Sequence, residues 1–174
     1  VPATMRDLTE YSRKAGKQVV RLAKAGITPS MIMTKEAFRN AIVVHSAIGG
    51  STNALIHLPA IAKELGIELN RKIPHIGNVN PSGKHLTESF WFAGGIPMVQ
   101  VMLKDHLDLD VLTVTGKTLG ENLEEIQREG FFERNIGYLH NYGLEREDVI
   151  TPVETTKEMG SIAVLKGNLA PEGA

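Results

Sequence analysis

The stretch of this sequence best suited to bind a ligand is the turn Gly49-Gly50-Ser51-Thr52-Asn53, where two glycines precede three small polar side chains. Glycine lets a ligand approach the backbone closely. The turn lies between two predicted helices, so its polar residues stand at a helix amino end, where free N–H groups favour a carboxylate or phosphate oxygen. Residue types alone leave two interpretations open, a binding turn and a plain helix cap, of which the cap is the commoner feature.

Other motifs in the chain do not meet the requirements of the sites that they resemble. Gly116-Lys117-Thr118 is similar to the end of a phosphate-binding P-loop, but Val111 stands where that loop needs its first glycine. The turn at residues 49–53 ends in asparagine and follows a helix, whereas a nucleophile elbow needs a final glycine and a preceding strand. The six histidines include no helical metal-binding pair with an intervening glutamate. We therefore predict no catalytic and no metal-binding residue within this chain.

Composition places the chain among ordinary globular proteins. Its 174 residues are 42% apolar and 22% charged, which is enough for the core of one domain. The net charge of −1 provides no field for nucleic acid or an anionic membrane, and no apolar run reaches the roughly 18 residues that span a bilayer. The absence of cysteine excludes disulfides, thiol nucleophiles and a self-supplied iron–sulfur cluster. We expect a cytoplasmic protein and, since the chain opens at Val1 without a methionine, a piece of a larger one.

Apolar spacing predicts several helices that would carry these residues. They cover residues 5–25, 37–48, 52–65, 87–91 and 96–107, with a further helix from residue 118 onward. Thr34 and Thr87 are predicted N-caps, one residue of the 51–53 turn caps the third helix, and Thr118 with Glu121 matches a capping box. Pro59 predicts a kink in the third helix, because proline removes a backbone hydrogen bond.

Strands are predicted at Ile73–Ile76, Val111–Val114 and Ser161–Leu165. The segment from Gly130 to Lys157 is rich in charges and turn formers and has little period, which favours a connection or an exposed excursion. The chain is therefore predicted to be helix-rich α/β, with a domain border between Glu145 and Gly160.

Several stretches are, in order along the chain, similar to one known family. They are residues 34–42, Ala-Ile-Gly-Gly-Ser-Thr-Asn-Ala at 47–54 with His57-Leu58, Pro-Ser-Gly-Lys at 81–84, Ala-Gly-Gly-Ile-Pro at 93–97, Leu-Thr-Val-Thr-Gly-Lys-Thr-Leu-Gly-Glu-Asn at 112–122 and Leu-Lys-Gly-Asn-Leu-Ala-Pro at 165–171. No single stretch is diagnostic, but the ordered set spans nearly the whole chain. On these stretches the chain resembles the dihydroxy-acid dehydratase and sugar-acid dehydratase family, which includes 6-phosphogluconate dehydratase.

The resemblance implies a middle slice of a longer protein. Residues 1–150 would be part of the large α/β amino-terminal dehydratase domain, and residues 151–174 the linker and first strand of a smaller β-rich domain. The family's active site lies between these domains, with an iron–sulfur cluster on cysteines, a magnesium ion on acidic residues and a modified lysine, and a serine base. The family pattern puts those groups outside this chain. The resemblance then makes Gly50, Ser51, Thr52 and Asn53 the predicted substrate-binding residues.

The implied activity is that of a hydro-lyase that dehydrates a 2,3-dihydroxy acid to a 2-keto acid. Two substrate branches compete, sugar acids such as aldonates and branched-chain dihydroxy acids. Phe90-Trp91-Phe92 is more similar to the sugar-acid branch, unless these aromatics only pack the core.

The implied partners are a small hydroxy acid and, for the full-length protein, further copies in a dimer or tetramer; no nucleic acid and no membrane are expected. An alternative from another class is a non-catalytic scaffold or interaction fragment, because the chain lacks the cluster ligands and the base. The isolated chain is expected to be inactive.

Overall fold

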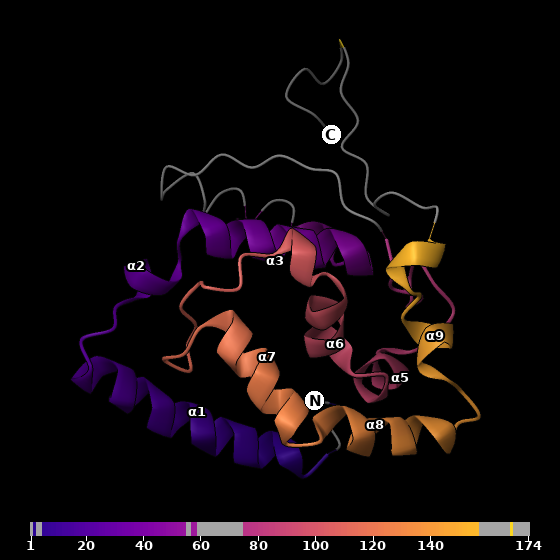
Figure 1. Ribbon diagram of the computed structural model, residues 1–174, viewed down its shortest axis with the longest axis horizontal. Helices are drawn as coiled ribbons and strands as arrows, with labels where there is room; N and C mark the ends of the chain where they lie inside the picture. The colour runs from indigo at the N-terminus through magenta and orange to yellow at the C-terminus, as the bar shows by residue number, and fades with distance from the viewer. Residues whose placement is uncertain (1, 3–4, 55–56, 59–74, 157–167, 169–174) are drawn as a thin grey trace.

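The computed structural model describes residues 2, 5–54, 57–58, 75–156 and 168 (Figure 1). The helices in these ranges are α1 (Asp7–Lys24), α2 (Pro29–Ile32), α3 (Lys35–Ile48), α5 (Thr87–Phe92), α6 (Gly95–Met102), α7 (Leu119–Arg128), α8 (Phe131–His140) and α9 (Arg146–Val149), with 3-10 turns at Lys104–His106 and Val153–Thr155. Residues 52–54 and 57–58 are also helical. Strands are absent from these ranges, which contain three isolated β-bridges. The described part of the chain is therefore helix-rich, as predicted, while the strands of the predicted α/β class are not seen in it. No helix in it is long and apolar enough to cross a membrane.

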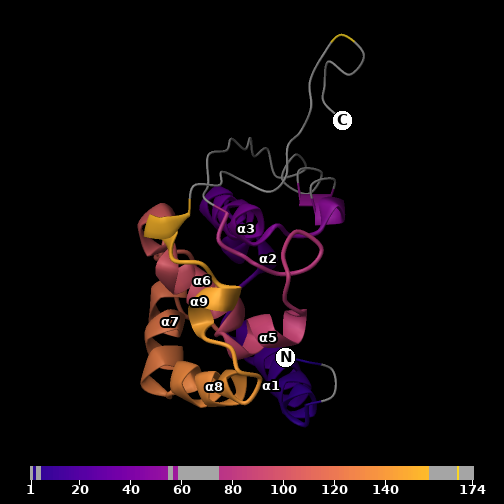
Figure 2. The same ribbon diagram turned by 90° about the vertical axis from the view of Figure 1, so that its right-hand side faces the viewer.

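Helix α6 forms the centre of the fold and packs against α3, α5 and α7, while α8 packs against α5 and α7. Its sequence, GIPMVQVM, is apolar almost all round, as expected of a helix enclosed by others. Helix α3 lies along one edge of the molecule, and α1 and α8 lie along the opposite edge (Figures 1 and 2).

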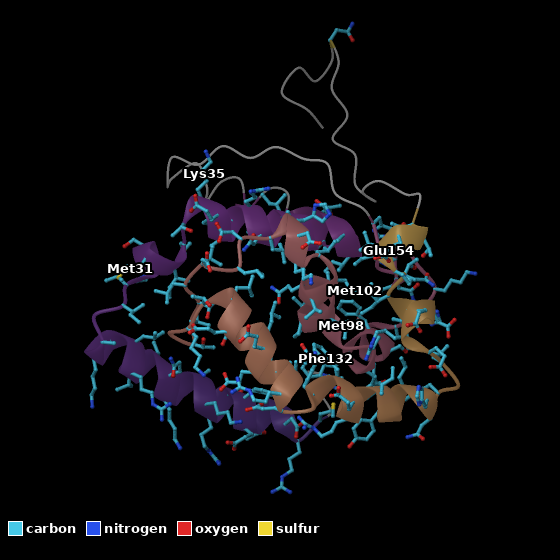
Figure 3. All side chains as sticks on the ribbon, viewed as in Figure 1. Met31, Lys35, Met98, Met102, Phe132 and Glu154 are labelled. Atoms are coloured by element: carbon cyan, nitrogen blue, oxygen red, sulfur yellow. The ribbon has the colours of Figure 1, made fainter. Side chains whose placement is uncertain are left out.

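Aromatic and aliphatic side chains from α5, α6 and α8 fill the core. Met98 and Met102 of α6 and Phe132 of α8 lie in the interior (Figure 3), where Met98 and Phe132 belong to the buried cluster. The Trp91 ring meets Phe131 edge-on at 5.3 Å, and the Phe92 ring lies 5.5 Å from that of Tyr138. Phe92 therefore packs in the core and Trp91 against it, while the substrate branch indicated by Phe90-Trp91-Phe92 stays a prediction.

The predicted caps are mostly confirmed. Thr34 Oγ1 accepts the Ala37 N–H at 3.2 Å and begins α3. At α7, Thr118 Oγ1 accepts the Glu121 N–H at 3.2 Å, and the Glu121 carboxylate accepts the Thr118 N–H at 2.7 Å. The prediction for Thr87 is wrong: this residue is the first of α5, and its N-cap is Leu86, which offers no side-chain acceptor.

The strand predicted at Val111–Val114 does not form. Leu112 makes one bridge to Thr118, and the residues between them form a turn in which the Thr113 N–H bonds the Lys117 carbonyl at 2.9 Å. The β-branched residues here fit an extended backbone, but no neighbouring strand in the described part of the chain pairs with them. Local propensity is therefore overridden by context.

The interpretation of Gly130 to Lys157 as an exposed excursion is also wrong for its described part. This segment contains α8 and α9 and contributes Phe132, Leu139, Val149 and Ile150 to the core. The missed helix has a simple cause: Asn135 occupies the buried face of α8 between Phe132 and Leu139, and a polar residue there interrupts the apolar period.

Other predicted elements lie wholly or partly outside the described residues. They are the third helix beyond residue 58 with its Pro59 kink, the strand at Ser161–Leu165 and the first half of the strand at Ile73–Ile76. Ile76 itself is not in a strand, and Gly77 makes an isolated antiparallel bridge to Ile150. The domain border between Glu145 and Gly160 stays a prediction.

Helix α1 has the predicted amphipathic pattern, but its apolar side is not buried. No residue of α1 is buried, and Leu8, Tyr11 and Val19 are 41%, 45% and 63% exposed. The helix is held through Gln18, whose Nε2 donates to the Thr115 carbonyl at 2.8 Å. The amphipathic spacing therefore predicts the helix correctly, but it does not predict whether the apolar side of the helix is buried.

Candidate functional site

The turn singled out in the sequence joins two helices. Gly49 ends α3 in the left-handed conformation with φ of 62°, which glycine adopts without strain. Ser51 then begins the next helix: its Oγ accepts the Asn53 N–H at 3.3 Å, and its carbonyl accepts the Ala54 N–H at 3.0 Å. The predicted N-cap is thus confirmed, and Ser51 is the residue that provides it.

This turn forms one wall of a cavity of about 540 Å³, a size typical of small-molecule sites. The opposite wall consists of residues 79–81, which precede α5, and of Thr87 and Phe90 in α5. The cavity is lined by Ile48, Gly49, Gly50, Ser51, Thr52, Val79, Asn80, Pro81, Thr87 and Phe90.

Backbone hydrogen bonds fix the opposite wall. The Asn80 N–H donates to the His85 carbonyl at 2.9 Å, and the Gly83 N–H donates to the Val79 carbonyl at 2.8 Å. A Cβ on Gly83 would lie 2.2 Å from the backbone of Asn78, so this tight turn requires glycine. The same segment is tied to α3, because the Ala47 carbonyl accepts the N–H of Ile76 at 2.7 Å.

The lining combines neutral polar groups with apolar side chains. Its polar side chains are the hydroxyls of Ser51, Thr52 and Thr87 and the amide of Asn80, and none of its residues is titratable. The backbone N–H groups of Ser51 and Thr52 make no hydrogen bond within the described ranges. Such donors suit the oxygen atoms of a small hydroxy acid. The wall can bind and orient a ligand, and it supplies no general acid or base.

Gly50, Ser51 and Thr52, three of the four predicted site residues, line the cavity. Asn53 is not among the lining residues. Sequence reasoning missed Asn80 and Thr87 as lining residues, although Asn80 directly precedes the Pro81–Lys84 stretch that carries part of the family resemblance and Thr87 follows it by three residues. It could not have placed them opposite the glycine turn, because the two walls come together only through the packing of α3 against the segment before α5.

The P-loop-like residues serve the local fold. Lys117 Nζ lies 2.8 and 2.9 Å from the two carboxylate oxygens of Glu125, and Thr118 caps α7. The hydrogen bond from Lys117, together with its charge, holds the pKa of the Glu125 carboxyl below its usual value. This lysine is therefore engaged in an ion pair with α7.

The chain has no ligand set for the iron–sulfur cluster implied by the resemblance, and its described residues do not fit the implied magnesium ion. The sequence has no cysteine to ligate iron. Within the described ranges, no group of three histidine, aspartate or glutamate side chains is placed to hold a metal ion.

The family model and the relatives that match this chain all indicate the same family. Residues 1–122 match the family described as dihydroxy-acid/6-phosphogluconate dehydratase, N-terminal. The chain is 41% identical to a dihydroxy-acid dehydratase of Halothermothrix orenii, covering 100% of this chain and 31% of that protein. It is 43% identical to dihydroxy-acid dehydratase 2 of Staphylococcus saprophyticus, covering 99% of this chain and 30% of that protein. It is 38% identical to a dihydroxy-acid dehydratase of Methanothermobacter thermautotrophicus, covering 95% and 29%. The chain thus spans about 30% of the length of the curated relatives it matches.

Proposed function

Because this chain belongs to the dihydroxy-acid/6-phosphogluconate dehydratase family, we propose that it forms part of a hydro-lyase that converts a 2,3-dihydroxy acid to a 2-keto acid. The observation that carries the proposal is the family match over residues 1–122, supported by relatives about 40% identical that are named dihydroxy-acid dehydratases. In the reaction a proton leaves C2 and a hydroxide leaves C3, together as water, and the resulting enol becomes the 2-keto acid.

Within this chain we propose a binding role for the glycine turn. The hydroxyls of Ser51 and Thr52, with their backbone N–H groups, would donate to the carboxylate or hydroxyl oxygens of the substrate. Gly50 would contribute its backbone to the wall of the site, and Asn53 would lie at its edge. The apolar wall that includes Phe90 would face the carbon chain.

A second hollow of about 450 Å³ beside α8 is a poorer place for an acidic substrate. Its lining includes the carboxylates of Glu133, Glu145 and Glu147, which outnumber the one guanidinium, that of Arg146. Like charges at close range disfavour binding of a carboxylate. The cavity at the glycine turn has no acidic lining residue and is the better candidate.

The proposed site is tested with Thr52→Ala in the full-length protein. Thr52 lines the cavity but does not provide the helix cap, so its hydroxyl can be removed without disturbing the Ser51 hydrogen bonds. Losing a hydrogen bond to a charged substrate oxygen costs about 1.5–3 kcal/mol, so kcat/KM should fall roughly ten- to a hundredfold. Ser51→Ala should lower kcat/KM similarly and also cost about 1 kcal/mol of stability, because it removes a cap.

Thr9→Ala is the matched control, since Thr9 is an exposed threonine within a helix. If Thr52→Ala and Ser51→Ala leave kcat/KM at the level of that control, the turn is only a cap and the proposed site is wrong.

A non-catalytic scaffold or interaction fragment remains the second candidate, favoured by the absence of cysteine from the chain. Anaerobic iron–sulfur reconstitution, followed by iron analysis and a keto-acid assay, is carried out on the 174-residue chain and on the full-length protein. We expect neither cluster nor turnover from the chain alone, and both from the full-length protein. A full-length protein without turnover on either substrate branch would favour the scaffold.

Several finer points stay predictions. They are the choice between a sugar acid and a branched-chain dihydroxy acid, the assignment of residues 1–150 and 151–174 to two domains, the homo-oligomeric state, the cytoplasmic location, and the iron–sulfur cluster and magnesium ion of the full-length protein.

A further inference from the structure

We infer that His45 is a positioning residue for the substrate-binding turn, an inference that rests on the proposed function of that turn. His45 lies in the last turn of α3 and is half-buried. It is not among the residues that line the cavity. It therefore acts on the site through Gly50 and Ser51, which do line it.

The His45 ring holds the backbone of Ser51. Its Nε2 lies 2.8 Å from the Ser51 carbonyl oxygen. A carbonyl oxygen can only accept, so Nε2 must carry the hydrogen in this bond. The same carbonyl accepts the Ala54 N–H at 3.0 Å, and the two bonds together fix the direction of the first turn of the helix.

The ring also explains why residue 50 is a glycine. A Cβ on Gly50 would lie 2.3 Å from Cδ2 and 2.7 Å from Nε2 of His45, far inside van der Waals contact. Gly50 does not have a positive φ, so the requirement comes from the close approach of the ring and not from the backbone conformation. The histidine ring and the glycine therefore form one packed unit.

The backbone of His45 also contacts the turn, in addition to the hydrogen bond and the packing made by its ring. Its carbonyl accepts the N–H of Gly49 and, at 3.0 Å, the N–H of Gly50. His45 thus contacts three consecutive residues of the turn. The groups that His45 leaves unbonded, the Ser51 and Thr52 N–H groups and hydroxyl hydrogens, belong to residues that line the cavity. A small rotation of the turn would misdirect all of these donors, and loss of orientation is costly to binding and catalysis.

The test uses the full-length protein with His45→Gln, His45→Asn and His45→Ala. The Gln amide N–H can reach a carbonyl at the distance of the histidine Nε2, whereas the Asn amide is one methylene shorter. We expect KM to rise about tenfold in His45→Ala and His45→Asn with a smaller change in kcat, and His45→Gln to recover most of the loss. His106→Ala, at an exposed histidine, is the control.

The pair of amide variants keeps the test decisive if His45→Ala does not fold. Equal KM values for His45→Gln and His45→Asn, or KM values at the level of His106→Ala, would overturn the inference. A further arm combines His45→Asn with Thr52→Ala. If His45 acts through the turn, the fold loss of kcat/KM in the double variant should be smaller than the product of the two single fold losses. A loss equal to that product would overturn the inference.

Failure of this inference differs from failure of the proposed function. If Thr52→Ala and Ser51→Ala lower kcat/KM but the His45 variants do not, only the role of His45 is wrong. If none of the turn variants changes kcat/KM, the turn does not bind substrate, and the role inferred for His45 falls with it.

Discussion

At the scale of single residues, the glycine turn places a helix cap in the wall of a cavity, so the two interpretations that residue types left open are compatible. Ser51 caps a helix and also lines a cavity, so the cap and the binding turn are not exclusive. The cap uses the Ser51 Oγ as an acceptor, which leaves its hydroxyl hydrogen to donate to a ligand.

The packing of Gly50 against His45 gives a prediction for stability. Gly50→Ala should cost about 1–3 kcal/mol, because the new methyl group overlaps the histidine ring. In a His45→Ala background the ring is gone, and the same change should cost much less. Urea unfolding of the two single variants and the double variant measures the coupling. Strictly additive effects would mean that the ring does not set the requirement for glycine.

A second residue-scale prediction concerns Asn40, which is buried in α3. Its Nδ2 donates to the Asp108 carbonyl at 2.7 Å, and its Oδ1 accepts the Asp108 N–H at 2.9 Å. Asn40→Ala leaves both backbone groups without a partner and should cost about 1–3 kcal/mol in urea unfolding. Asn141→Ala, at an exposed asparagine, should cost under about 0.5 kcal/mol. Equal losses for the two variants would contradict this role of Asn40.

At the scale of elements, the sequence was informative where the determinant is local. Thr34 and the Thr118–Glu121 box were predictable because a cap requires only residues within one turn of each other. Val111–Val114 was misassigned because strand formation needs a partner that lies elsewhere. Helix α8 was missed because Asn135 sits on its buried face. The glycine turn was found from its own residues, but the opposite wall of the cavity depends on tertiary packing.

The ion pair between Lys117 and Glu125 gives a pH-dependent prediction for α7. A carboxyl pKa that is lower in the folded state adds stability above the unfolded pKa, and this is lost as pH falls through the folded value. Glu125→Gln should therefore lower the urea midpoint slightly at pH 7, and this difference should shrink as pH falls through the folded pKa of Glu125, where the carboxyl becomes protonated. The pair is exposed, so high salt should reduce the difference.

Glu124→Gln is the matched control for that experiment, because Glu124 is the exposed neighbour on the same helix. It should show no pH-dependent difference from the parent chain. A Glu125→Gln effect of the same size at pH 3 and pH 7 would mean that the ion pair is not its source.

At the scale of the whole molecule, the described chain consists of a packed helical body and one helix that contributes little to it. The core draws on α3, α5, α6, α8 and the residues around α9, but on no buried residue of α1. The apolar side of α1 is exposed, and an isolated helix of 18 residues is marginal in water. The chain spans about 30% of the length of its curated relatives, so the exposure of α1 described here is that of the chain by itself.

The difference between α1 and the body predicts unequal local stability in the 174-residue chain. Amides of α1 can open without exposing buried apolar surface, whereas opening α3 or α6 breaks the core. Hydrogen exchange in α1 should therefore be on the order of a hundredfold faster than in α3 and α6. Mass spectrometry of peptides covering 7–24, 35–48 and 95–102 measures this directly, and a tenfold change in protein concentration is the control. Slow exchange in α1 only at high concentration would mean that self-association covers its apolar side. Slow exchange at both concentrations would contradict the weak attachment of α1, because its backbone could then open only together with the body.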